Sequence, residues 1–275
     1  MICFPNAKIN LGLNIVSKRS DGYHNLETVF YPIGIKEALE IIIKEDLKQD
    51  SFFQCGIQVD AIPSDNLVIK ALRLMREHYN FPPLEIHLLK KIPFGAGIGG
   101  GGSADASFML KLLNETFNLN VTKEKLIHLA LQLGADCPFF IYNKPKFATG
   151  GVGEILEDVE LSLKDYYFVL IKPDIHISTK DAFALVTPQQ PQTSLKEIIT
   201  YPVSSWKDLM VNDFEKSVFI KYPQIEDIKK DLYEKGALYA SMSGSGSSVF
   251  GIFKEEVSIP ENLYANHFVW VGQGM

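Results

Sequence analysis

The 275-residue chain has few cysteines and no long run of residues of one kind. Its three cysteines, Cys3, Cys55 and Cys137, are odd in number and lack C-x-x-C spacing, which excludes a disulfide framework and a typical zinc site. No apolar run approaches membrane-spanning length, so no membrane partner is expected. No Lys/Arg cluster offsets the net charge of −6, so a nucleic-acid partner is not expected either.

The beginning of the chain lacks the apolar core of a signal peptide, because Pro5, Asn6 and Lys8 stand where that core would lie. Together with the scattered cysteines, this predicts a protein of a reducing compartment, and we expect a cytoplasmic location. The apolar fraction of 46% and the charged fraction of 22% are typical of globular proteins.

The length allows one large domain or two of ordinary size. Residues 148–154 form a second glycine-rich segment, and the composition changes after it. We therefore place a domain boundary within residues 158–165, which gives an N-terminal domain of residues 1–157 and a C-terminal domain of residues 158–275.

The most informative stretch is residues 92–106, in which six of the fifteen residues are glycine. An alternating apolar pattern over residues 84–90 predicts a strand before it, and a helical pattern begins near Ala106. Glycines let backbone N–H groups wrap around an anion, and a helix N-terminus adds unpaired donors. Ser103 could cap that helix or offer its hydroxyl to a phosphate or a metal. The stretch therefore predicts a phosphate-binding loop; the alternative is a flexible turn with a serine cap.

This glycine segment is not a P-loop, because no lysine precedes Ser103. It does match G-x-G-x-x-G from Gly95 to Gly100, but a dinucleotide site also needs an acidic residue about 20 residues later, at the end of the next strand. The nearest acidic residue to that position is Glu115, which lies at the end of the predicted helix and on no predicted strand. A dinucleotide site is therefore disfavoured.

The N-terminal strand is predicted by apolar alternation over residues 9–15. Its other face carries Lys8, Asn10 and Asn14. From this stretch alone, an ordinary solvated face is the preferred interpretation of these three polar residues.

Two further positions each admit two interpretations. In the turn at residues 20–25, the ring of Tyr23 and the imidazole of His24 could stack on a base or sugar, or could form a packed pair. Asp136 lies between a helix end and an apolar segment, and is either the N-cap of the segment after Pro138 or a partly desolvated carboxylate with a chemical role.

Periodicity, capping residues and turn signals predict the remaining elements. The expected strands cover residues 39–43, 53–59, 166–171 and 268–271, with a strand–loop–strand unit over residues 238–251. One expected helix follows the candidate caps Ser64, Asp65 and Asn66. A second runs from Thr122 to Gly134, and a third starts at Ser178. Two more are expected over residues 205–216 and 224–235. The small residues of the loop within 238–251 permit a close backbone approach to a ligand or to another loop.

Five of these stretches, taken in order and spacing, resemble the kinases named for galactokinase, homoserine kinase, mevalonate kinase and phosphomevalonate kinase. They are the glycine segment, Gly134–Phe140, Gly151–Glu154, Ser243–Gly246, and the pairing of Pro5–Leu11 with Asp21–His24. That pairing is the most specific part, and it resembles the branch of the family that acts on a diphosphocytidyl alcohol.

The resemblance implies an α+β fold of two domains, with a ribosomal S5 domain 2-like N-terminal half, a ferredoxin-like C-terminal half and the active site in the interdomain cleft. It also implies an ATP-dependent transferase that phosphorylates the 2-hydroxyl of 4-diphosphocytidyl-2-C-methyl-D-erythritol in the non-mevalonate route to isoprenoid precursors. The alternatives are a kinase of the same superfamily for another small alcohol, and a nucleotide-binding module without catalysis.

The resemblance also assigns roles to residues. Asp136 would be the base on the acceptor hydroxyl, with Lys8 as its neighbour, and the small-molecule substrate would contact Asn10, Tyr23, His24 and Thr179. Mg²⁺ would lie between the ATP phosphates, and no protein ligand is assigned to it. The residues expected to bind ATP are Asn66, Lys90, Pro93, Phe94, Gly95, Ala96, Gly97, Ile98, Gly99, Gly100, Gly101, Gly102, Ser103 and Ala104. The run of four glycines from Gly99 is one longer than the family pattern.

Overall fold

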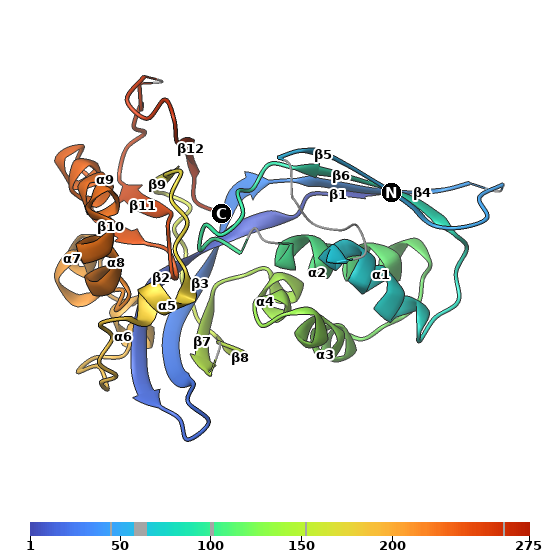
Figure 1. The fold of residues 1–275 in the computed structure, drawn as a ribbon, viewed down its shortest axis with the longest axis horizontal. Helices are drawn as coiled ribbons and strands as arrows, with labels where there is room; N and C mark the ends of the chain where they lie inside the picture. Colours follow the sequence, from blue (N-terminus) through green and yellow to red (C-terminus); the bar gives the residue numbers. More distant parts are fainter. Residues whose placement is uncertain (45, 58–64, 100–101, 152, 261) are drawn as a thin grey trace. The chain divides into compact units, whose positions relative to one another are not determined.

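The computed structural model describes residues 1–44, 46–57, 65–99, 102–151, 153–260 and 262–275 (Figure 1). These residues form two compact units. The first unit comprises residues 1–7, 35–94 and 99–144, and the second comprises residues 8–34, 95–98 and 145–275. Both units are discontinuous in sequence, so they differ from the expected continuous domains of residues 1–157 and 158–275, which stay a prediction.

The first unit is a four-stranded sheet with helices on one face (Figure 1). The strand order is β1-β4-β6-β5, in which β5 runs parallel to β6 and the other pairs are antiparallel. The strands are β1 (Ile2–Cys3), β4 (Ala38–Ile43), β5 (Ser51–Gly56) and β6 (Leu84–Lys90). The helices are α1 (Leu67–Arg76), α2 (Ser103–Thr116), α3 (Lys123–Leu133) and α4 (Cys137–Tyr142).

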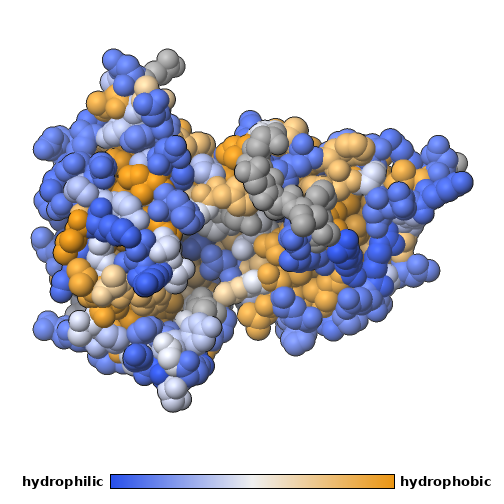
Figure 2. Space-filling view, in the orientation of Figure 1, coloured by the Kyte–Doolittle hydropathy of each residue, from blue (hydrophilic) through white to orange (hydrophobic). Residues whose placement is uncertain are grey.

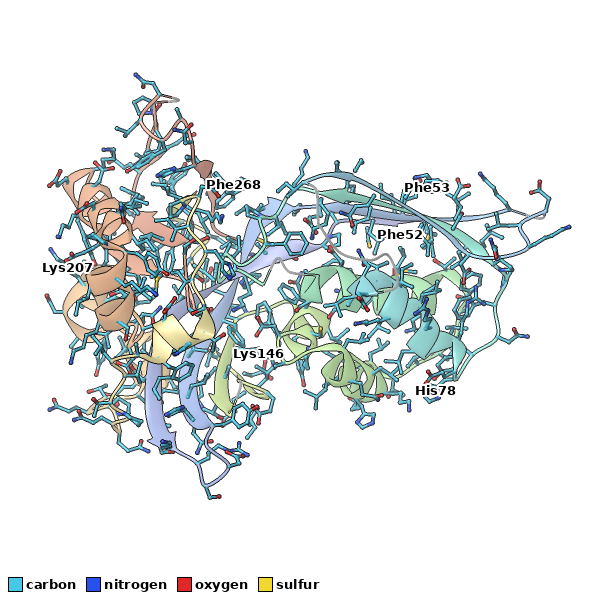
Figure 3. All side chains as sticks on the ribbon, viewed as in Figure 1. Phe52, Phe53, His78, Lys146, Lys207 and Phe268 are labelled. Atoms are coloured by element: carbon cyan, nitrogen blue, oxygen red, sulfur yellow. The ribbon has the colours of Figure 1, made fainter. Side chains whose placement is uncertain are left out.

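Alternation along the strands of the first unit separates its core from its surface. Phe52 packs against the helices, whereas Phe53 is 52% exposed and stacks on His87 with ring centroids 5.1 Å apart (Figure 3). The core between sheet and helices is built from Leu39, Ile41, Leu84, Ile86 and Leu88 of the sheet and from apolar residues of all four helices.

The second unit contains two four-stranded sheets, ordered β2-β3-β7-β8 and β10-β11-β9-β12. The first of these sheets consists of β2 (Asn6–Lys18), β3 (His24–Lys36), β7 (Lys146–Gly150) and β8 (Ile155–Asp158). The second consists of β9 (Tyr167–Lys172), β10 (Tyr239–Met242), β11 (Val249–Phe253) and β12 (Phe268–Gln273). Its helices are α5 (Thr179–Phe183), α6 (Leu195–Ile198), η2 (Val203–Ser205), α7 (Trp206–Leu209), α8 (Glu215–Lys221) and α9 (Pro223–Glu234).

The capping residues predicted from the sequence are confirmed at three helix starts. The side chains of Asn66, Thr122 and Ser178 accept hydrogen bonds from backbone N–H groups in the first turns of α1, α3 and α5. Gly134 ends α3, as predicted. The strand expected over residues 53–59 starts at Ser51 and ends at Gly56, and its last two positions, 58 and 59, lie outside the described residues.

The helix predicted over residues 205–216 is wrong. The chain leaves the helical path at Met210, whose backbone is extended, and α8 begins at Glu215. Between them, the N–H of Leu13 donates to the carbonyl of Val211 at 2.8 Å, and the N–H of Asp213 donates to the carbonyl of Leu13 at 2.9 Å. Pairing with β2 overrides the helical propensity of this segment.

Strand β3 was not expected from the sequence. Its centre, Val29 to Ile33, is apolar without alternation, and Pro32 within it argues against a strand, so neither strand signal is present. On the face that Figure 2 shows, apolar residues are scattered among hydrophilic ones. None of the described helices is long and apolar enough to cross a membrane.

Candidate active site

The polar face of β2 is buried, so the expectation of a solvated face is wrong. Lys8, Asn10 and Asn14 are 4%, 3% and 6% exposed. The ammonium of Lys8 donates to Oδ1 of Asn10 at 2.7 Å and lies 4.4 Å from the ring centroid of Phe30. The amide of Asn10 donates in turn to Oγ1 of Thr28 at 3.0 Å. Because burying a lysine is costly unless it is paired, this arrangement points to a role for its charge.

The glycine segment adopts backbone conformations that other residues disfavour. Gly95, Gly97 and Gly99 have φ values of +58°, +71° and +70°. The carbonyls of Ala96 and Ile98 accept hydrogen bonds from the N–H groups of Ser248 (3.2 Å) and Lys8 (3.0 Å). The segment is therefore a shaped loop, which argues against the alternative of a merely flexible turn. Gly100 and Gly101 lie outside the described residues.

The expected close approach of the loop at residues 243–248 is confirmed, and its partner is the glycine segment. A Cβ atom on Gly97 would lie 1.9 Å from the carbonyl oxygen of Ser243. The hydroxyl of Ser243 donates to the carbonyl of Gly97 at 2.7 Å and accepts from the N–H of Asn10 at 3.1 Å. One serine thus joins the glycine segment to β2.

Ser103 does not cap α2. Gly102 occupies the N-cap position with a φ of +106°, and a glycine has no side chain with which to cap the helix. Ser103 is the first residue of α2, and its Oγ would lie 3.9 Å from a Cβ atom on Gly134. The hydroxyl of Ser107 also donates to the carbonyl of Cys137 at 2.7 Å. Within the first unit, the N-terminus of α2 therefore lies beside the segment that leads to Asp136.

Asp136 stands at the N-cap position of α4, but its side chain makes no capping hydrogen bond. Its backbone is in the right-handed helical region, with φ of −79° and ψ of −16°, and the residue is half-buried. Of the two interpretations that the sequence left open, a side chain serving as an N-cap is excluded.

Lys90, expected near the adenosine, is only 1% exposed. Its ammonium donates to Glu37 at 2.7 Å and to Asp105 at 2.8 Å, and the Glu37 carboxylate also accepts the N–H groups of Lys91 and Ile92. Burial, with the Asp105 carboxylate close by, raises the pKa of Glu37. This cluster joins the end of β6 to the first turn of α2, so it fixes both ends of the glycine segment.

Neither Glu37 nor Asp105 was expected at this site. Glu37 stands 53 residues from Lys90 and carries no motif, and Asp105 lies at the end of the glycine segment without an assigned role. The side chain of Asn66 also makes hydrogen bonds within the protein. Its Oδ1 accepts from the N–H of Val68 at 2.9 Å, and its amide donates to Gln54 at 3.2 Å. The side chains of Asn66 and Lys90 thus make these hydrogen bonds within the first unit.

Tyr23 and His24 do not form a packed pair. Tyr23 is 67% exposed, whereas His24 stacks on Phe183 with ring centroids 4.9 Å apart. Phe183 is the last residue of α5, one turn after Thr179. The structure thus brings the loop of His24 to the helix of Thr179, through a phenylalanine that the sequence analysis did not identify.

Comparison with known proteins agrees with this arrangement. The family model "GHMP kinases N terminal domain" matches residues 66–144, and "GHMP kinases C terminal" matches residues 196–267. The chain is 60% identical over 274 residues, 99% of each chain, to the 4-diphosphocytidyl-2-C-methyl-D-erythritol kinase of Parabacteroides distasonis. It is 61% identical over 260 residues, 94% of each chain, to the protein of the same name from Bacteroides fragilis. The chain belongs to the 4-diphosphocytidyl-2-C-methyl-D-erythritol kinase family of the GHMP kinases.

Solved structures of GHMP kinases share the fold. A crystal structure of 4-(cytidine 5'-diphospho)-2C-methyl-D-erythritol kinase, 29% identical, superposes with a TM-score of 0.83 and covers 100% of both chains. The mevalonate kinase of Methanococcus jannaschii, 14% identical, gives a TM-score of 0.71 over 100% of this chain and 98% of its own. The predicted two-domain α+β kinase fold is confirmed, and as a GHMP kinase the chain is an ATP-dependent phosphotransferase.

The described residues of this GHMP kinase include no group of three or more His, Cys, Asp or Glu side chains that could hold a metal ion. Mg²⁺ usually keeps several waters and is held by one or two carboxylates together with substrate phosphates. The positive φ values at Gly95, Gly97 and Gly99 and the open N-terminus of α2 fit such a phosphate-borne ion better than a dedicated cage.

Proposed function

We propose that the chain transfers the γ-phosphoryl group of ATP to the tertiary 2-hydroxyl of 4-diphosphocytidyl-2-C-methyl-D-erythritol, in the non-mevalonate route to isoprenoid precursors. The observation that carries this proposal is the 60% identity to a relative of that name over 99% of both chains. We also propose that it acts in the cytoplasm, which is consistent with three free cysteines.

The ATP phosphates would bind along residues 93–104. The N-terminus of α2 supports this placement, since a 14-residue helix without a side-chain cap presents unpaired N–H groups and the positive end of its dipole. Ser103, at the first position of that helix, would offer its hydroxyl to the phosphates. Mg²⁺, when bound between the phosphates, would neutralise the charge that develops on the transferred group.

Asp136 would accept the proton of the substrate hydroxyl as its oxygen bonds to the γ-phosphorus. The bond from that phosphorus to the bridging oxygen breaks, and ADP leaves. Lys8 would face the transferred group with its positive charge and stabilise the negative charge that develops there. The contacts of Lys8 with Asn10 and Phe30 support this role, because they hold the ammonium in one position.

The cytidine would bind at the loop of Tyr23 and His24. The exposed ring of Tyr23 is available to stack on a base. The next residue, His24, stacks on Phe183, and this pair adds a second aromatic group to the same loop. Thr179, one turn from Phe183, would contact the substrate from α5. Contacts with the distant cytidine would hold the hydroxyl for transfer.

A coupled ADP-release assay tests this function. Purified protein with ATP and Mg²⁺ is offered the diphosphocytidyl alcohol, mevalonate, homoserine and galactose in parallel. We expect turnover with the diphosphocytidyl alcohol alone. Turnover with another alcohol would reassign the substrate within the superfamily, and ATP binding without turnover on any of them would support a non-catalytic module.

A further inference from the structure

The segment that interrupts the predicted helix, Val211–Glu215, connects two parts of the second unit. Its backbone pairs with β2 at Leu13, and the carboxylate of Asp213 accepts the N–H of Ile15 at 2.6 Å. On the other side, Oε1 of Glu215 accepts the N–H of Met242 at 2.8 Å. The segment thus holds β2 and the end of β10 together.

Asn212 is at the centre of this segment and is 3% exposed. Its carboxamide N–H₂ donates to two backbone carbonyls, those of Met242 and Gly244, each at 2.8 Å. Its Oδ1 accepts from the N–H of Phe214 at 3.0 Å. Both amide hydrogens and the carbonyl oxygen are therefore used, and no other side chain of similar size offers two donors and one acceptor in this form.

The two carbonyls that Asn212 holds lie on either side of Ser243. Ser243 contacts both parts of the proposed machinery, since its hydroxyl donates to Gly97 and accepts from Asn10. Oδ1 of Asn10 accepts a hydrogen bond from the ammonium of Lys8, and the backbone N–H of Lys8 donates to the carbonyl of Ile98. A shift of the Ser243 turn would therefore move the glycine segment and Lys8 together.

We propose that Asn212 is a positioning residue for phosphoryl transfer, which holds the Ser243 turn so that Lys8 and the glycine segment keep their register. This role rests on the proposed function. Asn212 touches neither substrate in this account and acts only through Ser243. Its loss should lower kcat far more than it changes the KM for the alcohol, because misplacement of reacting groups costs rate.

The test compares Asn212→Ala with Asn114→Ala in the full-length protein. Asn114, in the other unit, is the matched control, because its carboxamide also bonds only backbone groups: it donates to the carbonyl of Val121 at 3.2 Å and accepts from the N–H of Val121 at 2.9 Å. At a temperature where both variants are folded, we expect Asn212→Ala to lower kcat by about 10–100-fold with a KM for the alcohol within about threefold, whereas Asn114→Ala keeps kcat within about twofold. Equal kcat in the two variants would overturn the proposal.

Ser243→Ala provides a second variant that removes one hydroxyl and leaves the Asn212 contacts in place. If both residues act through one path, the double variant should lose little more than the worse single variant. Fully additive losses in ln kcat would contradict a shared path. This comparison also keeps the proposal testable if Asn212→Ala does not fold, since Ser243→Ala alone must then lower kcat without a matching loss of thermal stability.

Amide hydrogen exchange gives a measurement that needs no substrate. In Asn212→Ala, the N–H groups of Lys8, Asn10 and Ser248 should exchange at least about tenfold faster, while those of α9 remain protected. Uniformly faster exchange across the second unit would mean general destabilisation and would overturn the positioning role. An inactive wild type would refute the proposed function instead, and exchange would still decide whether Asn212 holds the turn.

Discussion

Gly97 and Ser243 meet backbone to backbone, so closely that a Cβ atom on residue 97 would lie 1.9 Å from the Ser243 carbonyl oxygen. Both partners are backbone atoms, so a side-chain rotation cannot relieve the contact. The contact joins the glycine segment to the loop between β10 and β11, 146 residues later in the chain. It explains why both stretches are rich in small residues.

Gly97→Ala should therefore reduce stability and ATP binding together. The alanine would suffer from the positive φ of +71° and from the backbone clash. Gly236→Ala is the control, because Gly236 has a φ of +93° and nothing within 4 Å of the position that a Cβ atom would take. We expect the control to lose about 1–2 kcal/mol of the free energy of unfolding and Gly97→Ala to lose clearly more, measured by denaturant unfolding. Equal losses of this free energy would show that the loop of Ser243 shifts to make room for the added methyl group.

Deletion of Gly102 should be tolerated, because it restores the family spacing and leaves Gly101 to take the N-cap position. Gly102→Ala should be worse than the deletion, since the residue has a φ of +106° and its Cβ would lie 3.3 Å from Leu67. Calorimetric ATP binding measures both, with circular dichroism as the check of folding. A large loss of ATP affinity in the folded deletion variant would mean that the longer loop has a phosphate geometry of its own.

The buried cluster of Glu37, Lys90 and Asp105 predicts a pH dependence of stability. Burial raises the pKa of Glu37 from 4.5 to about 8. The folded chain then keeps a proton that the unfolded chain releases, so the free energy of unfolding falls as pH rises from about 4.5 to about 8. Glu37→Gln, which cannot ionise, should lose this part of the pH dependence.

Thermal unfolding at pH 5 and pH 8 tests this prediction, with Glu77→Gln as the control, since Glu77 is exposed in the same unit. Wild type and the control should lose stability over this interval relative to Glu37→Gln. A Glu37→Gln variant with an unchanged pH profile would show that Glu37 is ionised in the folded chain and fully paired with Lys90.

Tyr23→Ala should lower kcat/KM for the diphosphocytidyl alcohol by about 5–150-fold, which corresponds to the 1–3 kcal/mol typical of stacking on a base. The control is a substrate, methylerythritol 4-phosphate, which lacks the cytidyl group. Wild type should use it poorly, with a lower kcat as well as a higher KM, and Tyr23→Ala should use it no worse than wild type does. Unchanged kcat/KM for the full substrate in Tyr23→Ala would remove Tyr23 from the nucleotide site.

Local signals in the sequence predicted much of the fold. Caps such as Thr122 and Ser178 and the alternation over residues 84–90 are determined by nearest neighbours, and all of them are confirmed. The helix over residues 205–216 failed because its middle pairs with Leu13, about 200 residues earlier. Pairing between such distant segments leaves no periodic trace in either one.

The candidate site shows the same limit. The solvated face expected for Lys8 and Asn10 was the reasonable local interpretation, and only the partners Thr28, Phe30 and Ser243 make it a buried one. Phe183 and Glu37 also received no role from the sequence, because each contacts a residue far away in the chain, and Asp105 received none although it lies within the glycine segment. The motifs located the glycine segment and Asp136, whereas the supporting residues required the structure.

The most direct test of the account is the single-turnover rate of phosphate ester formation on the diphosphocytidyl alcohol, in wild type and in Asp136→Asn. Asp227→Asn, an exposed substitution on α9, serves as the control. We expect ATP affinity to be nearly unchanged in Asp136→Asn and the rate to fall by about 10²–10⁴-fold, the usual contribution of a positioned base. Lys8→Met should likewise lower the rate more than the ATP affinity. A rate in Asp136→Asn within about threefold of wild type would contradict the assignment of Asp136 as the base.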